Sequence, residues 1–495
     1  MALEMLETGW VSILPPVLAI TLALITKEVY SSLFVGICSG MLIYSFFAGE
    51  TIWAAAGHVF DMMAAKIADN AYMIIFLALL WAVVVVVTRS GGSQAYGRWA
   101  GTKLKSKRSS LLATALLGLL IFIDDGFNCL TVGTVMGPIA DKHRISREKL
   151  AYIIDATAAP VCIIAPVSSW AVAVASELSD ADGFSAFLRT IPYNLYALLT
   201  LLMVFFLCLT GMDFGPMRRA EERTGADAPV REETAQETDG KGKVMDLLLP
   251  LLVLIVCAIA GMAYVGGFFS GVPFSQAIGA APTAGLTLGA FAGLVCAMVL
   301  YLPRRVMGFH AFMDSIVEGV KNIVPPMLIL ILSWSLSGVC RELIGTGSFV
   351  SRFVSSAQLP LWLLPALVFV IAAFLSFSMG TAWGTFGILI PIVSMICAGD
   401  QAAGLLIPSL GATLAGSVYG DHCSPLSDTT ILASTGAQVK HIDHVETQLP
   451  YAALVAVVCA FGYILVGLLK NPWLPLGLCA ALLLATLTVI RRLRL

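Results

Sequence analysis

Two carboxylates, one imidazole and several hydroxyls are concentrated between Gly420 and Thr430, a stretch that reads GDHCSPLSDTT. It follows an apolar run, Leu405 to Tyr419, that is long enough to cross most of a membrane. A charged side chain at the bilayer centre costs roughly 2.5–3.5 kcal/mol on insertion scales. Gly420 is a poor helix former and Pro425 lacks a backbone donor, so we expect the helix to break here. Because broken backbone at membrane depth is tolerated only inside protein or beside a water-filled cavity, the stretch predicts a transport site.

Asp421 and Asp428, on either side of Pro425, are the strongest candidates for groups that bind a cation or a proton. His422 can titrate near physiological pH, and the competing interpretation makes it a hydrogen-bonded structural group. Hydroxyl oxygens are ligands that suit a hard cation such as sodium. This stretch supplies three of them as candidates for lining the site: Ser424, Ser427 and Thr429.

A second polar break, IDDGFN at residues 123–128, interrupts an apolar stretch over 109–140. If this tip is buried, its adjacent carboxylates, Asp124 and Asp125, cannot both ionise cheaply, so one should hold a proton that can be exchanged for a cation. The alternative is that one aspartate caps the returning half-helix. Two residues that follow are candidates for lining the same site: Asn128 and Thr131.

Asp155 lies six residues into an apolar crossing, where the second half of the chain has Gly411. We expect it to bind the ion; the alternatives are that it reaches the cytoplasmic face or pairs with Lys149. Further hydroxyls lie near the prolines of this crossing and at a second interrupted hairpin, where simple packing is an equal alternative. They are Ser168, Ser169, Thr381 and Thr385.

The composition is that of an integral membrane protein. The 495 residues are 58% hydrophobic and 12% charged, with a mean hydropathy of +0.90, whereas soluble chains carry roughly 25% charged residues. The repeated apolar runs of about 20 residues indicate membrane helices. Eleven cysteines sit singly, as buried hydrophobes do. We find no nucleophile–base set, P-loop, Rossmann loop or zinc spacing, so an enzyme, a cofactor and a nucleic-acid partner are not expected.

We predict an all-α polytopic membrane protein with about eleven crossings and two re-entrant hairpins. The hairpins span 109–140 and 359–398, each interrupted in the middle by small or polar residues. The crossings are expected at 9–26, 30–48, 69–88, 149–177, 188–210, 245–266, 283–302, 323–340, 403–430, 451–469 and 472–490.

Basic residues orient this arrangement. The loops 89–108 and 141–149 are rich in Lys and Arg and belong in the cytoplasm, whereas the segment 178–187 contains neither and belongs outside. The N-terminus is then external and the C-terminus cytoplasmic. His441 and His444 are expected on the surface of a cytoplasmic loop. The hydrophilic segment 211–243 is predicted to be a solvated cytoplasmic linker, with a small regulatory domain as the alternative.

The linker separates two halves that match in sequence. Trp81 corresponds to Trp334, Thr131-Val132-Gly133 to Thr385-Phe386-Gly387, and Pro166–Ser169 to Pro425–Asp428, in the same order along the chain. Five crossings per half make the repeats inverted, with discontinuous helices meeting at the midplane. The predicted units are the first repeat 1–210, the linker 211–243, the second repeat 244–470 and an extra crossing within 471–495.

The sequence resembles the NhaC-type sodium/proton antiporter family of the ion-transporter superfamily. Residues 122–136, 159–170 and 420–432 carry the resemblance. It implies an inverted-repeat carrier in the cytoplasmic membrane that exchanges sodium for protons. Gly126 departs from the family pattern, in which an aromatic residue is expected after the two aspartates. The family also includes carriers of malate and lactate, and a small residue at this tip could open room for such a substrate.

The working hypothesis is therefore a secondary antiporter that exports Na⁺ in exchange for H⁺ by alternating access. Sodium would bind at the carboxylates, with lipid as the surrounding solvent, and a homodimer is left open. The runner-up is a carrier of an organic anion or amino acid coupled to Na⁺ or H⁺, although no intramembrane Arg or Lys is evident for a carboxylate. A channel is a third class, for which no selectivity-filter loop is seen.

Overall fold

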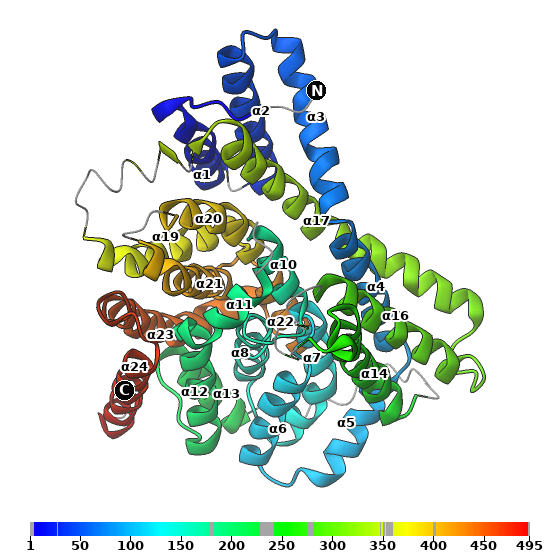
Figure 1. The fold of residues 1–495 in the computed structure, drawn as a ribbon. Helices are drawn as coiled ribbons and strands as arrows, with labels where there is room; N and C mark the ends of the chain where they lie inside the picture. The colour runs from blue at the N-terminus through cyan, green and yellow to red at the C-terminus, as the bar shows by residue number, and fades with distance from the viewer. Residues whose placement is uncertain are drawn as a thin grey trace.

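A computed structural model describes residues 4–26, 28–178, 183–227, 242–272, 274, 277, 282–346, 348–349, 352, 360–398 and 402–493. All regular elements within these ranges are helical (Figure 1). Nine of the helices there are long and apolar enough to cross a membrane, which confirms the all-α membrane class. The count of eleven crossings and the re-entrant course of the two hairpins stay predictions.

The first half contains helices up to residue 210, followed by one helix in the predicted linker. In order they are α1 (Leu14–Thr26), α2 (Val29–Phe47), α3 (Ile52–Asp69), α4 (Ala71–Arg89), α5 (Gly92–Lys103), α6 (Lys107–Leu120), α7 (Asp125–Lys142), α8 (Arg147–Ala156), α9 (Ala159–Cys162), α10 (Ser169–Glu177), α11 (Gly183–Thr190), α12 (Leu195–Thr210) and α13 (Gly215–Asp227).

The second half repeats much of this order with longer helices. They are α14 (Val244–Val265), α16 (Pro282–Tyr301), α17 (Phe309–Gly338), α19 (Leu364–Met379), α20 (Ala382–Ile396), α21 (Leu406–Cys423), α22 (Asp428–Ala437), α23 (His441–Leu469) and α24 (Trp473–Leu493).

Both predicted hairpins are helix–break–helix units, and both predicted broken crossings are interrupted. Side-chain oxygens start the four half-helices that follow a break, because the first backbone N–H groups of a helix have no partner within it. Asp124 accepts from Phe127 N at 3.0 Å and begins α7. The other three N-caps are Ser168 before α10, Thr381 before α20 and Ser427 before α22. The alternative in which one aspartate caps the returning half-helix is thus confirmed for Asp124.

Each hairpin tip contacts the break of its own half. The backbone N–H of Ser169 donates to the Ile123 carbonyl at 2.9 Å, and the hydroxyl of Ser424 donates to the Phe377 carbonyl at 2.8 Å. The second arms of the hairpins then cross to the other half, since α7 packs against α22 and α20 packs against α10. The broken helices therefore take part in the contacts between the halves, as does α4, which packs against α16 and α17. The division into inverted repeats stays a prediction.

Glycine allows the closest of these crossings. A Cβ on Gly133 of α7 would lie 2.4 Å from the backbone carbon of Gly436 in α22. Backbone atoms cannot move aside as the end of a flexible side chain can. The two helices can approach this closely only because both positions are glycine.

Part of the predicted linker is ordered, which corrects the expectation of a solvated segment. Residues 228–241 lie outside the described residues, but Gly215–Asp227 form α13, which packs against α8 and α23. Its Glu221 carboxylate accepts from the Ser146 backbone N–H at 2.7 Å and pairs with Lys107. Met217 is buried on the inner face. The charge pattern of 211–227 reflects ion pairing as well as exposure to water.

Candidate functional site

The N-terminal ends of four half-helices lie together at the breaks. Ser169 at the start of α10 donates to the Asp124 carboxylate at 3.2 Å. The rings of Trp170 and Trp383, in the first turns of α10 and α20, are 5.9 Å apart. At the second break, a Cβ on Gly380 would lie 2.6 Å from the Leu426 side chain. Each helix N-terminus carries a partial positive charge, so carboxylates are favoured here.

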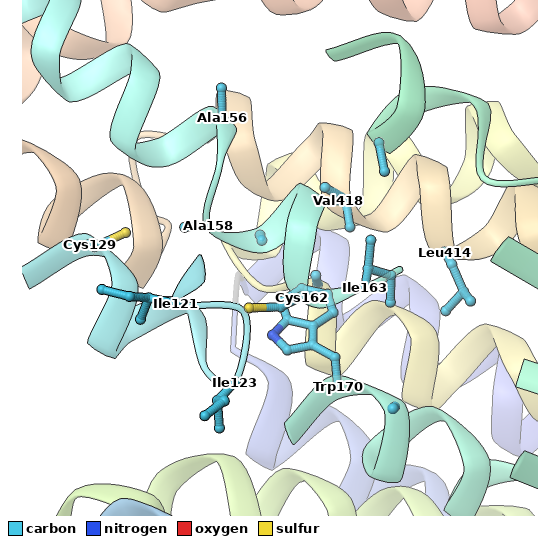
Figure 2. Close-up of a cluster of buried hydrophobic side chains, with 14 of the residues drawn as sticks. Ile121, Ile123, Cys129, Ala156, Ala158, Cys162, Ile163, Trp170, Leu414 and Val418 are labelled. Atoms are coloured by element: carbon cyan, nitrogen blue, oxygen red, sulfur yellow. The ribbon is translucent and has the colours of Figure 1, made fainter. Parts of the chain in front are cut away.

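An apolar cluster packs beside the first of these breaks (Figure 2). The indole of Trp170 lies beside Cys162 of α9, with Ile121 and Ile123 of the first break nearby. All four are nearly fully buried. The polar tip therefore sits on a packed surface that leaves it little freedom.

Asp421, in the last turn of α21, is held by the hydroxyls that follow it. Thr429 Oγ1 donates to Asp421 Oδ2 at 3.3 Å, and the Ser427 hydroxyl lies 2.8 Å from Thr429 Oγ1. The Asp421 side chain is 4% exposed. Asp125 lies within electrostatic reach of Asp421, which fits the packing of α7 on α22. A carboxylate of the first half, Asp125, therefore lies near one of the second half, Asp421, and the shared ion site expected at these residues stays a prediction.

The first tip presents Asp124 and Asp125 in different ways. The Asp124 carboxylate accepts from the Phe127 backbone N–H, as the helix cap, and from the Ser169 hydroxyl, whereas Asp125 Oδ1 accepts from the backbone N–H of Gly126 at 3.0 Å. Both side chains are buried. A Cβ on Gly126 would lie 3.3 Å from Leu432 and 3.5 Å from Trp81. The small residue thus leaves no spare room at the tip in this conformation, because neighbouring side chains fill it.

Asn128 ties three broken helix ends together. Its Nδ2 group donates to the carbonyls of Gly118 and Ile121, at the end of α6, and of Thr157, at the end of α8, over 2.7–3.0 Å. Its Oδ1 and the hydroxyl of Thr131 are buried and have no partner among the described residues. These two oxygens remain available to an ion.

Replacing Asn128 by leucine should destabilise the protein by about 3 kcal/mol or more, because each buried carbonyl left unpaired costs about 1–3 kcal/mol. Thermal unfolding of the purified protein in detergent measures this. Asn70→Leu is the control, since Asn70 is partly buried and its amide makes one such bond, to Lys66 at 3.0 Å. Equal losses in the two variants would contradict a structural role for the three Asn128 bonds.

Asp155 belongs to a separate group of side chains. Gln448 Nε2 donates to Asp155 Oδ2 at 2.8 Å, and His444 Nε2 lies 3.3 Å from the same oxygen. Lys149 pairs instead with Asp213, at 2.7 Å, so the alternative of a Lys149–Asp155 pair is wrong. The surface position expected for His444 is also wrong, because its side chain is fully buried.

Other predicted residues take structural positions at the breaks. Asp428 is exposed at the start of α22, although it too lies within electrostatic reach of Asp421. Ser168 donates to the Cys162 and Ala165 carbonyls, Thr385 to that of Thr381, and Ser424 to that of Phe377. His422 lies next to the Asp155 group, since its backbone carbonyl accepts from Gln448 Nε2, and its Nδ1 lies 2.8 Å from the Tyr196 hydroxyl.

Three buried polar residues escaped the sequence reasoning: His444, Gln448 and Glu177. The first two follow a helical spacing that runs into the apolar face of the predicted crossing 451–469, and this periodicity could have extended the helix backwards to His441. Glu177, at the end of α10, is 2% exposed, and its carboxyl oxygens have no partner among the described residues. Because Glu177 stands at the end of an apolar run, its carboxylate would ordinarily be expected on the surface.

Comparison with known proteins identifies relatives that match most or part of this chain. An uncharacterized protein of Haemophilus influenzae is 37% identical over 478 residues, which cover 92% of this chain and 90% of the relative. The malate-2H⁺/Na⁺-lactate antiporter of Bacillus subtilis is 31% identical over 189 residues, or 37% of this chain and 38% of that one. The YdaH transporter of Alcanivorax borkumensis has a similar fold, with a TM-score of 0.55 and 14% identity over 85% of this chain and 90% of its own.

The family description that matches the chain is the Na⁺/H⁺ antiporter family, over residues 173–468. The match includes the second hairpin, the broken helices α21 and α22, and Asp421. It agrees with the nine long apolar helices and with the carboxylates buried at the breaks. This chain is an integral membrane transporter that belongs to the Na⁺/H⁺ antiporter family.

Proposed function

We propose that this transporter exports Na⁺ in exchange for H⁺ at a site formed by Asp124, Asp125 and Asp421. The observation that carries the proposal is the state of these carboxylates. All three are buried, and none makes an ion pair with Lys or Arg within the described ranges. An uncompensated carboxylate is too costly to bury, so each must hold a proton or a cation.

Competition between the two ions for these carboxylates would couple their movements. Sodium would bind the deprotonated carboxylates with help from hydroxyl and amide oxygens, of which Thr429, Thr131 and Asn128 Oδ1 are the nearest candidates. Protons would displace it when the site faces the other side. Alternating access requires one group of helices to move against the other, with the broken helices carrying the site.

A sodium pulse should drive protons across the membrane of vesicles that contain the purified protein. A pH-sensitive dye trapped inside the vesicles measures this, with a potassium pulse of the same size as the control. The expected result is a saturable pH change with sodium and little with potassium. An equal response to both ions, or none to sodium, would contradict the proposal.

A second candidate is a carrier of an organic anion coupled to Na⁺ or H⁺. Two observations favour it: four helix N-termini meet at the breaks, and the Bacillus subtilis relative exchanges malate and lactate, as its name states. Repeating the vesicle assay with malate or lactate gradients separates the candidates. Sodium-driven proton movement that requires one of these anions would favour the second.

A further inference from the structure

We propose that Asp155, His444 and Gln448 form a proton-binding site that is distinct from the ion site at Asp421. The three residues come from two helices that are far apart in sequence, α8 and α23. All three are buried. The inference rests on the proposed Na⁺/H⁺ exchange and assigns the proton to a site of its own, apart from the sodium site.

The hydrogen-bond donors around Asp155 favour a proton over a metal cation. The Gln448 amide donates to Asp155 Oδ2 and, with its other hydrogen, to the backbone carbonyl of His422. His444 Nε2 faces the same carboxylate oxygen. A sodium ion on this oxygen would meet N–H groups, whereas oxygen ligands are what a hard cation prefers.

Charge balance points the same way. The basic residues at the start of α8 are engaged elsewhere, Arg147 with Asp141 and Lys149 with Asp213. Among the described residues, the imidazole in contact with the buried Asp155 carboxylate is that of His444, and neutralising this carboxylate requires one proton within the group. Imidazole is the side chain whose ordinary titration falls nearest neutral pH. The group is suited to gain and lose that proton under physiological conditions.

Unused polar atoms mark where the proton can reside. Three side-chain atoms of the group are buried without a partner among the described residues: Asp155 Oδ1, His444 Nδ1 and Gln448 Oε1. The first two can take up a proton, and the Gln448 oxygen can accept a hydrogen bond. A proton bound to the group therefore has alternative positions on Asp155 and His444.

Aromatic and titratable side chains surround the group. His422 lies beside it on α21, with its ring stacked on Tyr152 at a centroid distance of 6.3 Å and its Nδ1 2.8 Å from the Tyr196 hydroxyl. Further titratable or charged groups nearby, among the described residues, are Tyr451, Cys423, Cys129, the Lys149–Asp213 pair and Asp421.

The last turn of α21 connects the proton site to the ion site. Asp421 and His422 are consecutive, yet Asp421 faces Thr429 and His422 faces Tyr196. Asp155 is also within electrostatic reach of Asp421. A cation that binds at Asp421 would repel a proton on the neighbouring group across a medium of low dielectric constant. Binding of sodium would thus release the proton without sharing its ligands.

Calorimetric titration of the purified full-length protein with sodium, in two buffers of different ionisation enthalpy, counts the protons released for each sodium bound. We expect His444→Gln and Asp155→Asn to bind sodium but to release about one proton fewer than the wild type. The control His310→Gln, an exposed position on α17, should release as many as the wild type. Asp421→Asn should lose sodium binding.

Either of two results would overturn the proposal: full proton release by both cluster variants, or loss of their sodium binding as in Asp421→Asn. A second measurement, the melting temperature against pH without sodium, keeps the test separate from the proposed function. The wild type and His310→Gln should share one pH dependence, which flattens in His444→Gln and Asp155→Asn. If the wild type binds no sodium, the antiporter proposal fails, and identical pH curves for all four proteins would reject the proton site as well.

Discussion

Replacing Asp421 by asparagine should nearly abolish sodium-driven proton movement. The side chain is 4% exposed, keeps a hydroxyl partner in Thr429 and lies within electrostatic reach of Asp125. Asparagine preserves its shape but removes both the negative charge and the proton that the charge can bind. Loss of one partner from a buried charge pair costs about 3–5 kcal/mol, which corresponds to a loss of roughly two to four powers of ten in affinity.

The initial rate of the pH change in vesicles, measured over a range of sodium concentrations, tests this prediction. Asp314→Asn, at an exposed position on α17, is the control for loss of a carboxylate and should transport like the wild type. Asp428→Asn is the more informative comparison, because sequence reasoning ranked Asp428 with Asp421 and the structure leaves it exposed. We expect Asp428→Asn to keep most of the flux. Similar losses of flux in Asp421→Asn and Asp428→Asn would contradict the distinction that the structure makes between the buried and the exposed carboxylate.

Replacing Gly133 by valine should separate α7 from α22 and disable the site. A Cβ at this position would lie 2.4–2.6 Å from three backbone atoms of Gly436, so the helices themselves must move apart. Overpacking of a tight core typically costs about 1–3 kcal/mol, and the upper end applies where backbone is the obstacle. The movement would also draw Asp125 away from Asp421, so we expect transport to fall by at least about tenfold.

Gly57→Val provides a matched control, because Gly57 lies within a helix, α3, and a Cβ there has nothing within 4 Å. Both variants carry the same change in helix propensity, since valine is a somewhat better helix former than glycine, and they differ in what the new side chain meets. Melting temperature and vesicle transport should fall together in Gly133→Val and stay near the wild type in Gly57→Val. A Gly133→Val protein that transports normally would show that the close contact is not needed for the site.

Much of the architecture follows from local features of the sequence. Length and apolar content decide which runs become membrane helices, and Gly, Pro, Ser and Asp decide where they break. The breaks were predicted at residues 124–126 and around Gly420 and Pro425, because glycine and proline disfavour helix wherever they stand; in the structure the helices are interrupted at 121–124 and 424–427. Asp124 as a cap is local too, since its bond reaches only three residues ahead.

The partners of the buried polar residues could not be predicted in this way. Asp155 contacts His444 and Gln448, which lie 289 and 293 residues away in sequence. Both of these residues precede the apolar run of α23, so hydropathy placed His444 on the surface. Burial of a polar residue depends on what the rest of the chain packs against it, and hydropathy does not report that.

The sequence by itself thus determined a helical membrane transporter with polar breaks and carboxylates at them, because those signals act within one or two helical turns. Only the tertiary structure decided which carboxylates are buried. It brought Asp125 to Asp421, left Asp428 exposed and enclosed Asp155 with His444. The physical reason is that α7 and α22 approach through Gly133 and Gly436, and α8 and α23 through Asp155 and Gln448. These contacts join residues hundreds of positions apart and exist only in the folded protein.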